Sequence, residues 1–266
     1  MATVDGLLLD IDGVLAVSWE PIPGAVDAVA WFRRERIPFR LITNTTTHTR
    51  RGLAQTLGEA GFDVRADEIV TAVTATAAYL RAFHPSAPAF VLTDGDPGED
   101  LDGVPSTDRP EDAEVMVIGG ACDVFTYDLV NRIFRRVKDG APLVGMHRNL
   151  YWRTARGWEM DGGGYIAGLE EAAGVRATIC GKPAPPFFEA ALGLLGMPAT
   201  RVAMVGDDVV TDVLGAMAVG CTGVLVRTGK FQEGDLDKGT PDVVLDSLGD
   251  VPRWLTGPRG APTAGS

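Results

Sequence analysis

Residues 7–15 constrain the fold more than any other stretch, because they join an apolar run to two acidic residues. Leucines fill the three positions before Asp10, and a single isoleucine separates Asp10 from Asp12. This pattern predicts a buried strand that ends in a pair of carboxylates. Period-2 geometry places both carboxylates on one side of the extended backbone, and Gly13 allows a sharp turn directly after them. The start of the chain therefore predicts a strand whose end carries concentrated negative charge.

Two converging carboxylates repel each other, so such a pair either loses its charge or binds a cation. A hard divalent cation with oxygen ligands, Mg²⁺ first among them, satisfies Asp10 and Asp12 most simply. The alternative is that both acids cap a following helix, as aspartates often do. No helical pattern begins before Pro23, which favours the metal site.

Length, charge and cysteine content limit the class of protein and its partners. The 266 residues are 45% hydrophobic and contain no apolar run of about twenty residues, which predicts a globular chain without a membrane span. The formal charge of -12 argues against nucleic acid or an anionic membrane as a partner. The cysteines, at 122, 180 and 221, are odd in number and widely spaced, which argues against a disulfide framework. With no export signal at the N-terminus, these features predict a cytoplasmic protein.

Strand-like and helix-like segments alternate in the first part of the chain. A helical pattern at 24–36 follows the first strand, and a second buried strand is predicted at 37–43. Threonines 45–47 offer caps for a helix that runs to residue 60, and a short third strand is expected at 69–73. This β-α-β series predicts an α/β fold with a parallel sheet, whose ligands gather at the carboxyl ends of the strands.

The pattern changes after residue 76, where a second α/β unit with looser, glycine-rich connections begins. The first pattern resumes at residue 178. We therefore predict a discontinuous core domain at 1–76 and 178–256 and an inserted domain at 77–177. Within the insert, residues 148–164 are predicted to form a long loop. The glycine- and proline-rich residues 257–266 are predicted to be a disordered tail.

Two further strands are predicted to end in polar side chains suited to a phosphate group. Thr43 and Asn44 follow the second strand, where a hydroxyl and backbone N–H groups at a helix start can hold phosphate oxygens. Taken alone, this pair is more often a helix cap. Lys182 follows another apolar strand and precedes Pro183, which holds the residue before it extended. An ammonium group fixed there indicates a counter-charge to carboxylates, with an ordinary surface lysine as the alternative.

The fourth strand end combines a glycine with three acidic residues, Asp207, Asp208 and Asp212. We expect Asp207 to complete the oxygen shell of the metal, and Asp212 either to bind the metal through water or to orient Lys182. Asp208 is equally suited to cap the following helix. Each motif is modest by itself, but the ordered set of four points to a phosphate site with a metal.

This ordered set resembles the haloacid dehalogenase superfamily, and other segments resemble its NagD-like subfamily IIA branch. The motifs of the first resemblance are Asp-x-Asp-Gly-Val at 10–14, Thr-Asn at 43–44, Gly-Lys-Pro at 181–183 and Gly-Asp-Asp-x-x-x-Asp at 206–212. The motifs of the second are Glu-Pro-Ile-Pro-Gly-Ala at 20–25, Gly-Lys-Pro-Ala-Pro at 181–185 and Arg-Thr-Gly-Lys at 227–230. The resemblance covers nearly the whole chain and implies a Rossmann-like core with an inserted α/β cap of the C2 type.

The resemblance implies a magnesium-dependent phosphomonoesterase that works by two-step displacement. Asp10 is the implied nucleophile that forms an aspartyl phosphate, and Asp12 is the implied acid and base of both half-reactions. The implied ligands of the phosphoryl oxygens lie at the strand ends: Thr43, Lys182 and the backbone amides near Asp12, Gly13 and Asn44. The implied metal ligands are the Asp10 side chain, the Asp12 main-chain carbonyl and Asp207, with Asp212 in support.

In the cap, His147 and Asn149 are candidates for substrate contact, in a stretch rich in polar and aromatic side chains. Many relatives carry Asn-x-Asp where this chain has His147-x-Asn149, so the resemblance transfers no particular substrate. Small phosphomonoesters, phosphoramidates and pyrophosphate are the classes we expect. The alternative is that His147 and Trp152 pack the interior of the cap. The resemblance also allows a homodimer formed through the cap.

Other classes of function share parts of this pattern. A phospho-accepting signalling domain also clusters acids, a threonine and a lysine on a parallel sheet, but its accepting aspartate lies on a later strand than the acidic pair. A regulatory protein could keep the fold and lose turnover, although all four motifs are intact here. A dehalogenase would need neither Asp12 nor a metal. A phosphonate hydrolase would need a cap lysine, and Lys138, between the first and third motifs, has the pattern of a solvated helix face.

Overall fold

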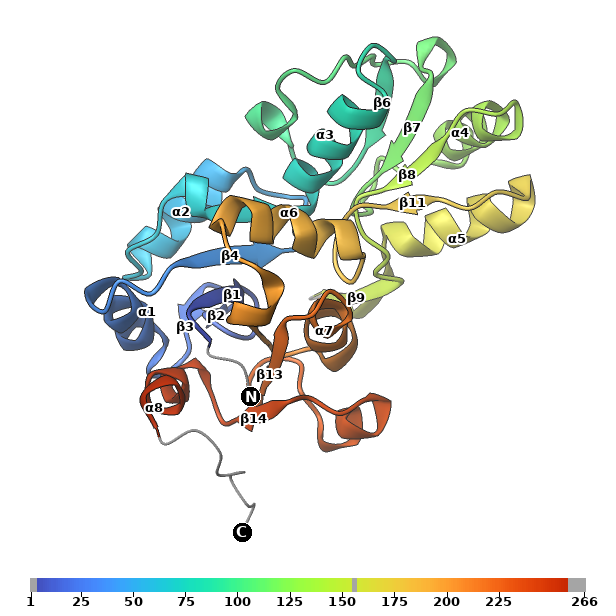
Figure 1. Ribbon diagram of the computed structural model, residues 1–266. Helices are drawn as coiled ribbons and strands as arrows, with labels where there is room; N and C mark the ends of the chain where they lie inside the picture. The colour runs from blue at the N-terminus through green and yellow to red at the C-terminus, as the bar shows by residue number, and fades with distance from the viewer. Residues whose placement is uncertain (1–3, 155–156, 258–266) are drawn as a thin grey trace. The chain divides into compact units, whose positions relative to one another are not determined.

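A computed structural model describes residues 4–154 and 157–257 (Figure 1). The described chain divides into two compact units. Unit 1 comprises residues 4–43, 50–70 and 182–257, and unit 2 comprises residues 44–49, 71–154 and 157–181. The predicted domain limits at 76 and 178 stay a prediction. The predicted disordered tail lies, apart from Gly257, outside the described residues.

Unit 1 is built on a six-stranded sheet in the order β14-β13-β12-β1-β4-β5. The strands are β1 (Gly6–Asp10), β4 (Phe39–Thr43), β5 (Ile69–Thr71), β12 (Val202–Gly206), β13 (Thr222–Val226) and β14 (Val243–Leu245). Strand β1 lies inside the sheet and pairs in parallel with both β4 and β12. The α/β fold with a parallel sheet, predicted from the alternating pattern, is confirmed. Since β1 is flanked by two parallel neighbours, three strand ends meet around Asp10.

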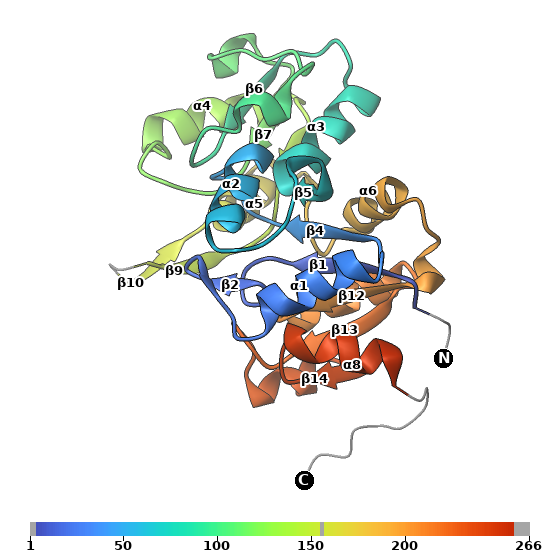
Figure 2. The ribbon, with the colours of Figure 1, turned by 90° about the vertical axis from the view of Figure 1, so that its left-hand side faces the viewer.

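Helices cover both faces of this sheet. Figure 2 shows α1 (Ala25–Arg34) and α8 (Val251–Thr256) side by side on one face. Helices α6 (Pro185–Leu195) and α7 (Gly215–Ala218), labelled in Figure 1, pack together on the other. Leu7 and Leu9 point into the core under α1, together with residues of α2 (Arg50–Glu59). Because side chains alternate along a strand, the side chains of Leu8 and Asp10 point to the opposite face. Alternation thus places the first carboxylate on the face that α6 and α7 cover.

Unit 2 has its own parallel sheet and its own core. Its strands, in the order β11-β8-β7-β6, are β11 (Thr178–Ile179), β8 (Leu143–Gly145), β7 (Val115–Ile118) and β6 (Ala89–Leu92). Its helices are α3 (Ala72–Phe83), α4 (Tyr127–Lys138) and α5 (Gly162–Ala173). Apolar side chains of these strands and of α4 and α5 form one core, which includes Met116, Ile133 and Ile166.

The prediction of a loop throughout 148–164 is wrong, because this segment contains an antiparallel hairpin of β9 (Tyr151–Thr154) and β10 (Gly157–Met160). Aromatic residues favour extended structure, and the rings of Tyr151 and Trp158 pack edge to face with centroids 5.5 Å apart. Both rings are exposed, so the segment lacks the buried apolar residues that make a strand easy to predict from sequence.

Short elements complete the chain. A second hairpin in unit 1 joins β2 (Ala16–Val17) to β3 (Glu20–Pro21). The 3₁₀ turns are η1 (Ala66–Glu68), η2 (Gly98–Leu101), η3 (Pro110–Asp112), η4 (Ala199–Arg201), η6 (Glu233–Lys238) and η7 (Leu248–Asp250), and η5 (Val209–Leu214) is π-helical. Among the described residues, no helix has the length and apolar character needed to cross a membrane.

Glu68 anchors the turn before β5 to helix α1. Its buried carboxylate accepts hydrogen bonds from both terminal nitrogens of Arg33, one of them at 2.6 Å, and from the Arg65 N–H at 2.9 Å. Burial alone would raise the pKa of Glu68, but the bonds from Arg33 and Arg65 outweigh it and lower the pKa. A carboxyl with a lowered folded-state pKa stabilises the fold above its unfolded value of 4.5, and this stabilisation is lost as the pH falls through the folded value.

We expect Glu68→Gln to lower the free energy of unfolding by about 2–3 kcal/mol at pH 7, because the buried carboxylate that pairs with Arg33 and Arg65 loses its charge. Urea unfolding followed by circular dichroism measures this difference. Asp67→Asn is the matched control, since Asp67 is exposed and its change should stay within about 0.5 kcal/mol. Equal stabilities of the Glu68→Gln variant and the unchanged protein would contradict the anchoring role.

Candidate active site

The candidate active site lies at the carboxyl ends of the central strands of unit 1. Asp10 is the last residue of β1, Thr43 is the last residue of β4, and Asp207 directly follows β12. The registers place Leu9 beside Val205 and Asp10 beside Ile42, so these strand ends are level with one another. Parallel strands therefore bring together side chains that lie far apart in the sequence.

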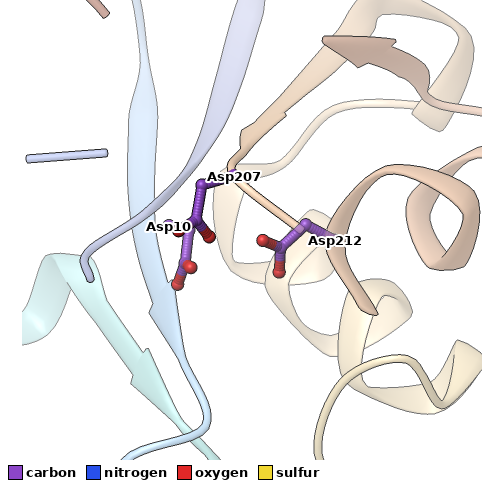
Figure 3. A group of neighbouring side chains, drawn as sticks. All are labelled: Asp10, Asp207 and Asp212. Carbon is purple, nitrogen blue, oxygen red and sulfur yellow. The ribbon is translucent and has the colours of Figure 1, made fainter. Parts of the chain in front are cut away.

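Lys182 lies between two aspartates in this cluster. Its ammonium is 2.6 Å from Asp10 Oδ1 and 2.7 Å from Asp212 Oδ1. All three side chains are buried, with 5% or less of each residue exposed. Figure 3 shows the carboxylates of Asp10, Asp207 and Asp212 directed toward a common space, and oxygens of the three lie within 4.8 Å of one another. The structure thus brings together four of the residues predicted from the strand-end motifs.

The balance of charge in the cluster is negative. Burial, followed by the charge of Asp212, raises the pKa of Asp207 to about 6. Burial, followed by the charge of Asp10, raises the pKa of Asp212 to about 7. Burial would lower the pKa of Lys182, but the charges of Asp10 and Asp212 outweigh it and raise the pKa. Three carboxylates therefore share one buried ammonium, and each extra positive charge would stabilise their ionised forms.

The residues present fit a divalent cation. Asp207 Oδ2 accepts a hydrogen bond from the Lys230 N–H at 2.6 Å, whereas Asp207 Oδ1 is buried without a hydrogen-bond partner among the described residues. A buried, unpartnered carboxylate oxygen is costly unless a cation or water completes it. Hard oxygen ligands are those that Mg²⁺ prefers. The donor set of Asp10, Asp207 and Asp212 is therefore suited to this ion.

Glycines allow the loops of the site to approach closely. Gly13 has a left-handed φ of 82°, and a Cβ on it would lie 2.0 Å from Asp207 Oδ2. A Cβ on Gly206 would lie 2.3 Å from the Cβ of Asp212. Asp12 is exposed and forms an isolated bridge with Ala16, directly after the β1 end. A larger residue at Gly13 or Gly206 would therefore displace the carboxylate of Asp207 or Asp212. Asp12 lies in the turn after β1 and is open to solvent.

Asp208 and Asp212 shape the start of the segment after β12. Asp208 Oδ1 accepts hydrogen bonds from the N–H groups of Val210 and Thr211, each at 2.9 Å. The N-cap alternative for Asp208 is confirmed. The Asp208 N–H lies 3.3 Å from Asp212 Oδ2 and donates to it, which directs the Asp212 carboxylate back toward the sheet. The segment after Asp208 is not one regular α-helix, because η5 is π-helical and α7 begins only at Gly215.

The remaining predicted residues, Asn44, His147 and Asn149, belong to unit 2. His147 is buried, and its Nδ1 accepts a hydrogen bond from the Asn149 N–H at 3.2 Å. His147 Nε2 lies 4.0 Å from Asp161 Oδ2. Burial lowers the pKa of His147, and the charge of Asp161 only partly opposes this. These contacts favour the packing alternative for His147.

Asn44 is half-buried and the Asn149 residue is exposed. Asp161 caps α5, and its Oδ1 accepts hydrogen bonds from the N–H groups of Ala121 and Gly162. The exposure of Asn149 leaves it open to a ligand, so its predicted substrate contact stays a prediction. The side chain of Trp152 lies outside the described residues.

The loop after β13, for which the sequence predicts no role, lies at the site in the structure. Thr228 Oγ1 donates a hydrogen bond to the Gly13 carbonyl oxygen at 2.5 Å, and the Lys230 N–H binds Asp207. Partial burial would lower the pKa of Lys230, but the charges of Asp207 and Asp10 outweigh it and raise the pKa. The sequence signal that could have identified this loop is its position, since residues 227–230 follow the end of another apolar parallel strand.

Fold and site together define a class: a parallel α/β protein in which acids and a lysine meet at the strand ends. A family model described as haloacid dehalogenase-like hydrolase matches residues 7–104, and one described as HAD-hydrolase-like matches residues 179–251. The chain belongs to the haloacid dehalogenase-like hydrolases, in their NagD-like subfamily IIA branch, and is a phosphatase.

Relatives match almost the whole chain. Human haloacid dehalogenase-like hydrolase domain-containing protein 2 is 34% identical over 239 residues, which is 90% of this chain and 90% of that protein. Human phospholysine phosphohistidine inorganic pyrophosphate phosphatase is 35% identical over 256 residues, 94% of this chain and 92% of that protein.

Solved structures agree with this assignment. The p-nitrophenyl phosphatase from Archaeoglobus fulgidus has a TM-score of 0.88 and 28% identity, and the match covers 95% of this chain and 99% of that one. NagD from Escherichia coli K-12 has a TM-score of 0.83 and 25% identity, with coverage of 93% and 98%.

Proposed function

We propose that this phosphatase hydrolyses small phosphomonoesters with Mg²⁺ and through an aspartyl phosphate on Asp10. The observation that carries the proposal is the buried Lys182 between Asp10 and Asp212, next to the unpartnered Oδ1 of Asp207. Phosphoramidates and pyrophosphate are further candidate substrates, because a relative with 35% identity is named for phospholysine, phosphohistidine and inorganic pyrophosphate.

Asp10 is suited to attack phosphorus. Lys182 holds its Oδ1 at 2.6 Å and favours the ionised carboxylate, which leaves the other oxygen to form the bond. Asp12, exposed on the turn after β1, gives a proton to the leaving oxygen and then takes one from the water that attacks the aspartyl phosphate. Thr43, Lys182 and backbone amides near Gly13 and Asn44 would hold the phosphoryl oxygens as charge spreads over them.

The metal would be held by the carboxylates of Asp10 and Asp207 and by the Asp12 carbonyl oxygen, with Asp212 in support. When bound, it supplies positive charge that reduces the repulsion between Asp10 and an anionic phosphate group. The three cysteines, free in the structure, support the proposed reducing, cytoplasmic location.

We also propose that two copies associate through unit 2. A groove of about 390 Å³ between α4 and α5 is lined mainly by apolar groups, and Trp158 and Met160 of the neighbouring hairpin are exposed. An apolar surface of this kind is typical of an interface. Sedimentation equilibrium measures the mass in solution and tests this association directly.

The function is tested with p-nitrophenyl phosphate and a panel of phosphoesters, phosphoramidates and pyrophosphate, assayed for released phosphate. We expect EDTA to lower turnover by at least about a hundredfold, and added Mg²⁺ to restore it, since the cation offsets several kcal/mol of charge repulsion. EDTA-resistant turnover would contradict the metal requirement. Absence of phosphate release from every compound would instead favour a regulatory protein that has lost turnover.

A further inference from the structure

A second lysine, Lys230, stands at the edge of the acidic cluster in unit 1. The Lys230 residue is partly open to solvent, whereas Lys182 is buried. The charge of Lys230 interacts with the carboxylates of Asp207, Asp10 and Asp212. Within the described part of the chain, its ammonium forms no hydrogen bond or ion pair. Its interactions with the carboxylates act over a longer range. The ammonium is therefore available to a ligand.

Backbone contacts of the loop after β13 fix the position of the Lys230 main chain. Its N–H donates to Asp207 Oδ2 at 2.6 Å, and the hydroxyl of Thr228 binds the Gly13 carbonyl. Gly229 has a φ of 63°, and a Cβ on it would lie 2.4 Å from the Cα of Gly13. The loop is therefore locked against both the turn after β1 and the end of β12, and the Lys230 side chain starts from a defined position at the site.

The charge of Lys230 exceeds what the cluster itself needs. Lys182 and one bound divalent cation together would balance the three carboxylates of Asp10, Asp207 and Asp212. A phosphoryl group seated at Asp10 would meet those buried charges. An ammonium at the edge of the cluster is instead placed for the part of the substrate that remains outside the buried cluster, which is the leaving group.

We propose that Lys230 determines specificity by binding an anionic oxygen group on the leaving group of the substrate. The preferred substrates then carry a carboxylate or a second phosphate a few bonds from the phosphoryl group. A leaving group with a positive charge is disfavoured, because it would face an ammonium. This inference rests on the proposed function, since it assumes that the phosphoryl group binds beside Asp10.

The test compares two ligands that share a phosphonate and differ in one carboxylate, methylphosphonate and phosphonoacetate. Calorimetric titration with saturating Mg²⁺ measures their dissociation constants without turnover. We expect the unchanged protein to bind phosphonoacetate about tenfold more tightly, the size of one charge-assisted contact. Lys230→Gln should remove this preference, and Lys230→Arg should retain most of it. Lys238→Gln is the matched control, because Lys238 is also exposed and pairs with Asp235.

Three results would overturn the inference: no preference for phosphonoacetate in the unchanged protein, an equal preference in Lys230→Gln, or an equal loss in Lys238→Gln. Circular dichroism of each variant checks that it is folded, so that a lost preference is not caused by unfolding. Hydrolysis of p-nitrophenyl phosphate by the same preparation tests the proposed function separately. A protein that binds both phosphonates with the expected preference but releases no phosphate would contradict the proposed function and leave the assignment of Lys230 intact.

Discussion

Asp10→Asn is expected to lower turnover of p-nitrophenyl phosphate by at least about 10⁵-fold, the loss seen when a nucleophile is removed. The amide has nearly the shape of the carboxylate, so the buried position at the end of β1 stays filled. It carries no negative charge and cannot form an acyl phosphate. Lys182 would still have Asp212 as its ion-pair partner, 2.7 Å away, so the cluster keeps one of its two buried pairs.

The matched control is Asp208→Asn, which makes the same chemical change in the same group of acids. Asp208 caps η5, and asparagine caps helices as well as aspartate does, so turnover should fall by no more than about fivefold. Brief reaction with labelled substrate and an acid quench should give a protein-bound phosphate that hydroxylamine releases. Asp10→Asn should give no such label. Turnover near that of the unchanged protein in this variant would refute Asp10 as the nucleophile.

The position of the site could be predicted from sequence because its signals are local. An apolar run ending in Asp10 fixes a buried strand, and strand alternation fixes the face of the sheet that its side chain occupies. The strand before Lys182, β11, belongs to the sheet of unit 2, so the sheet of unit 1 does not by itself explain the position of Lys182. The carboxyl ends of the parallel strands of unit 1 meet at one edge, so Asp207 could be expected beside Asp10 before any distance was known. The distances in unit 1 agree with this expectation.

Other features depend on contacts between distant segments, which no local pattern records. The hydrogen bond from Thr228 to Gly13 joins residues 215 positions apart. Asp207 has one hydrogen-bonded carboxylate oxygen and one without a partner among the described residues, and this difference depends on the position of the Lys230 backbone. His147 carries a polar side chain in a stretch of mixed character, and only the packed structure of unit 2 reveals its burial. Residues of this kind need tertiary structure before a role can be assigned.

Lys182→Met is expected to lower both turnover and stability. The methionine side chain resembles lysine in length but has no charge, so Asp10 and Asp212 would face each other without a cation between them. Turnover should fall by about 10³-fold or more, comparable to the removal of a cation that stabilises a phosphoryl transition state. The free energy of unfolding should fall by about 3–5 kcal/mol at pH 7.5, because breaking a buried ion pair leaves uncompensated charge.

The loss of stability should depend on pH. Without the ammonium, the pKa values of Asp10 and Asp212 should rise further above their ordinary value of 3.8, since burial already raises both. A carboxyl whose folded-state pKa is raised binds its proton more tightly in the folded protein, so stability falls as the pH rises above the unfolded value. The deficit of Lys182→Met should therefore shrink between pH 7.5 and pH 5. Urea unfolding at both pH values measures this, with Lys238→Met as the control.

The double variant Lys182→Met/Asp212→Asn separates the two contributions of Lys182. Removing one of the facing carboxylates relieves the repulsion, so most of the lost stability should return. Turnover should stay low, because the ammonium that orients Asp10 and meets the phosphoryl oxygens is still missing. Recovery of both stability and turnover would mean that Lys182 only balances buried charge. Recovery of stability alone would mean that its position 2.6 Å from Asp10 also serves the reaction itself.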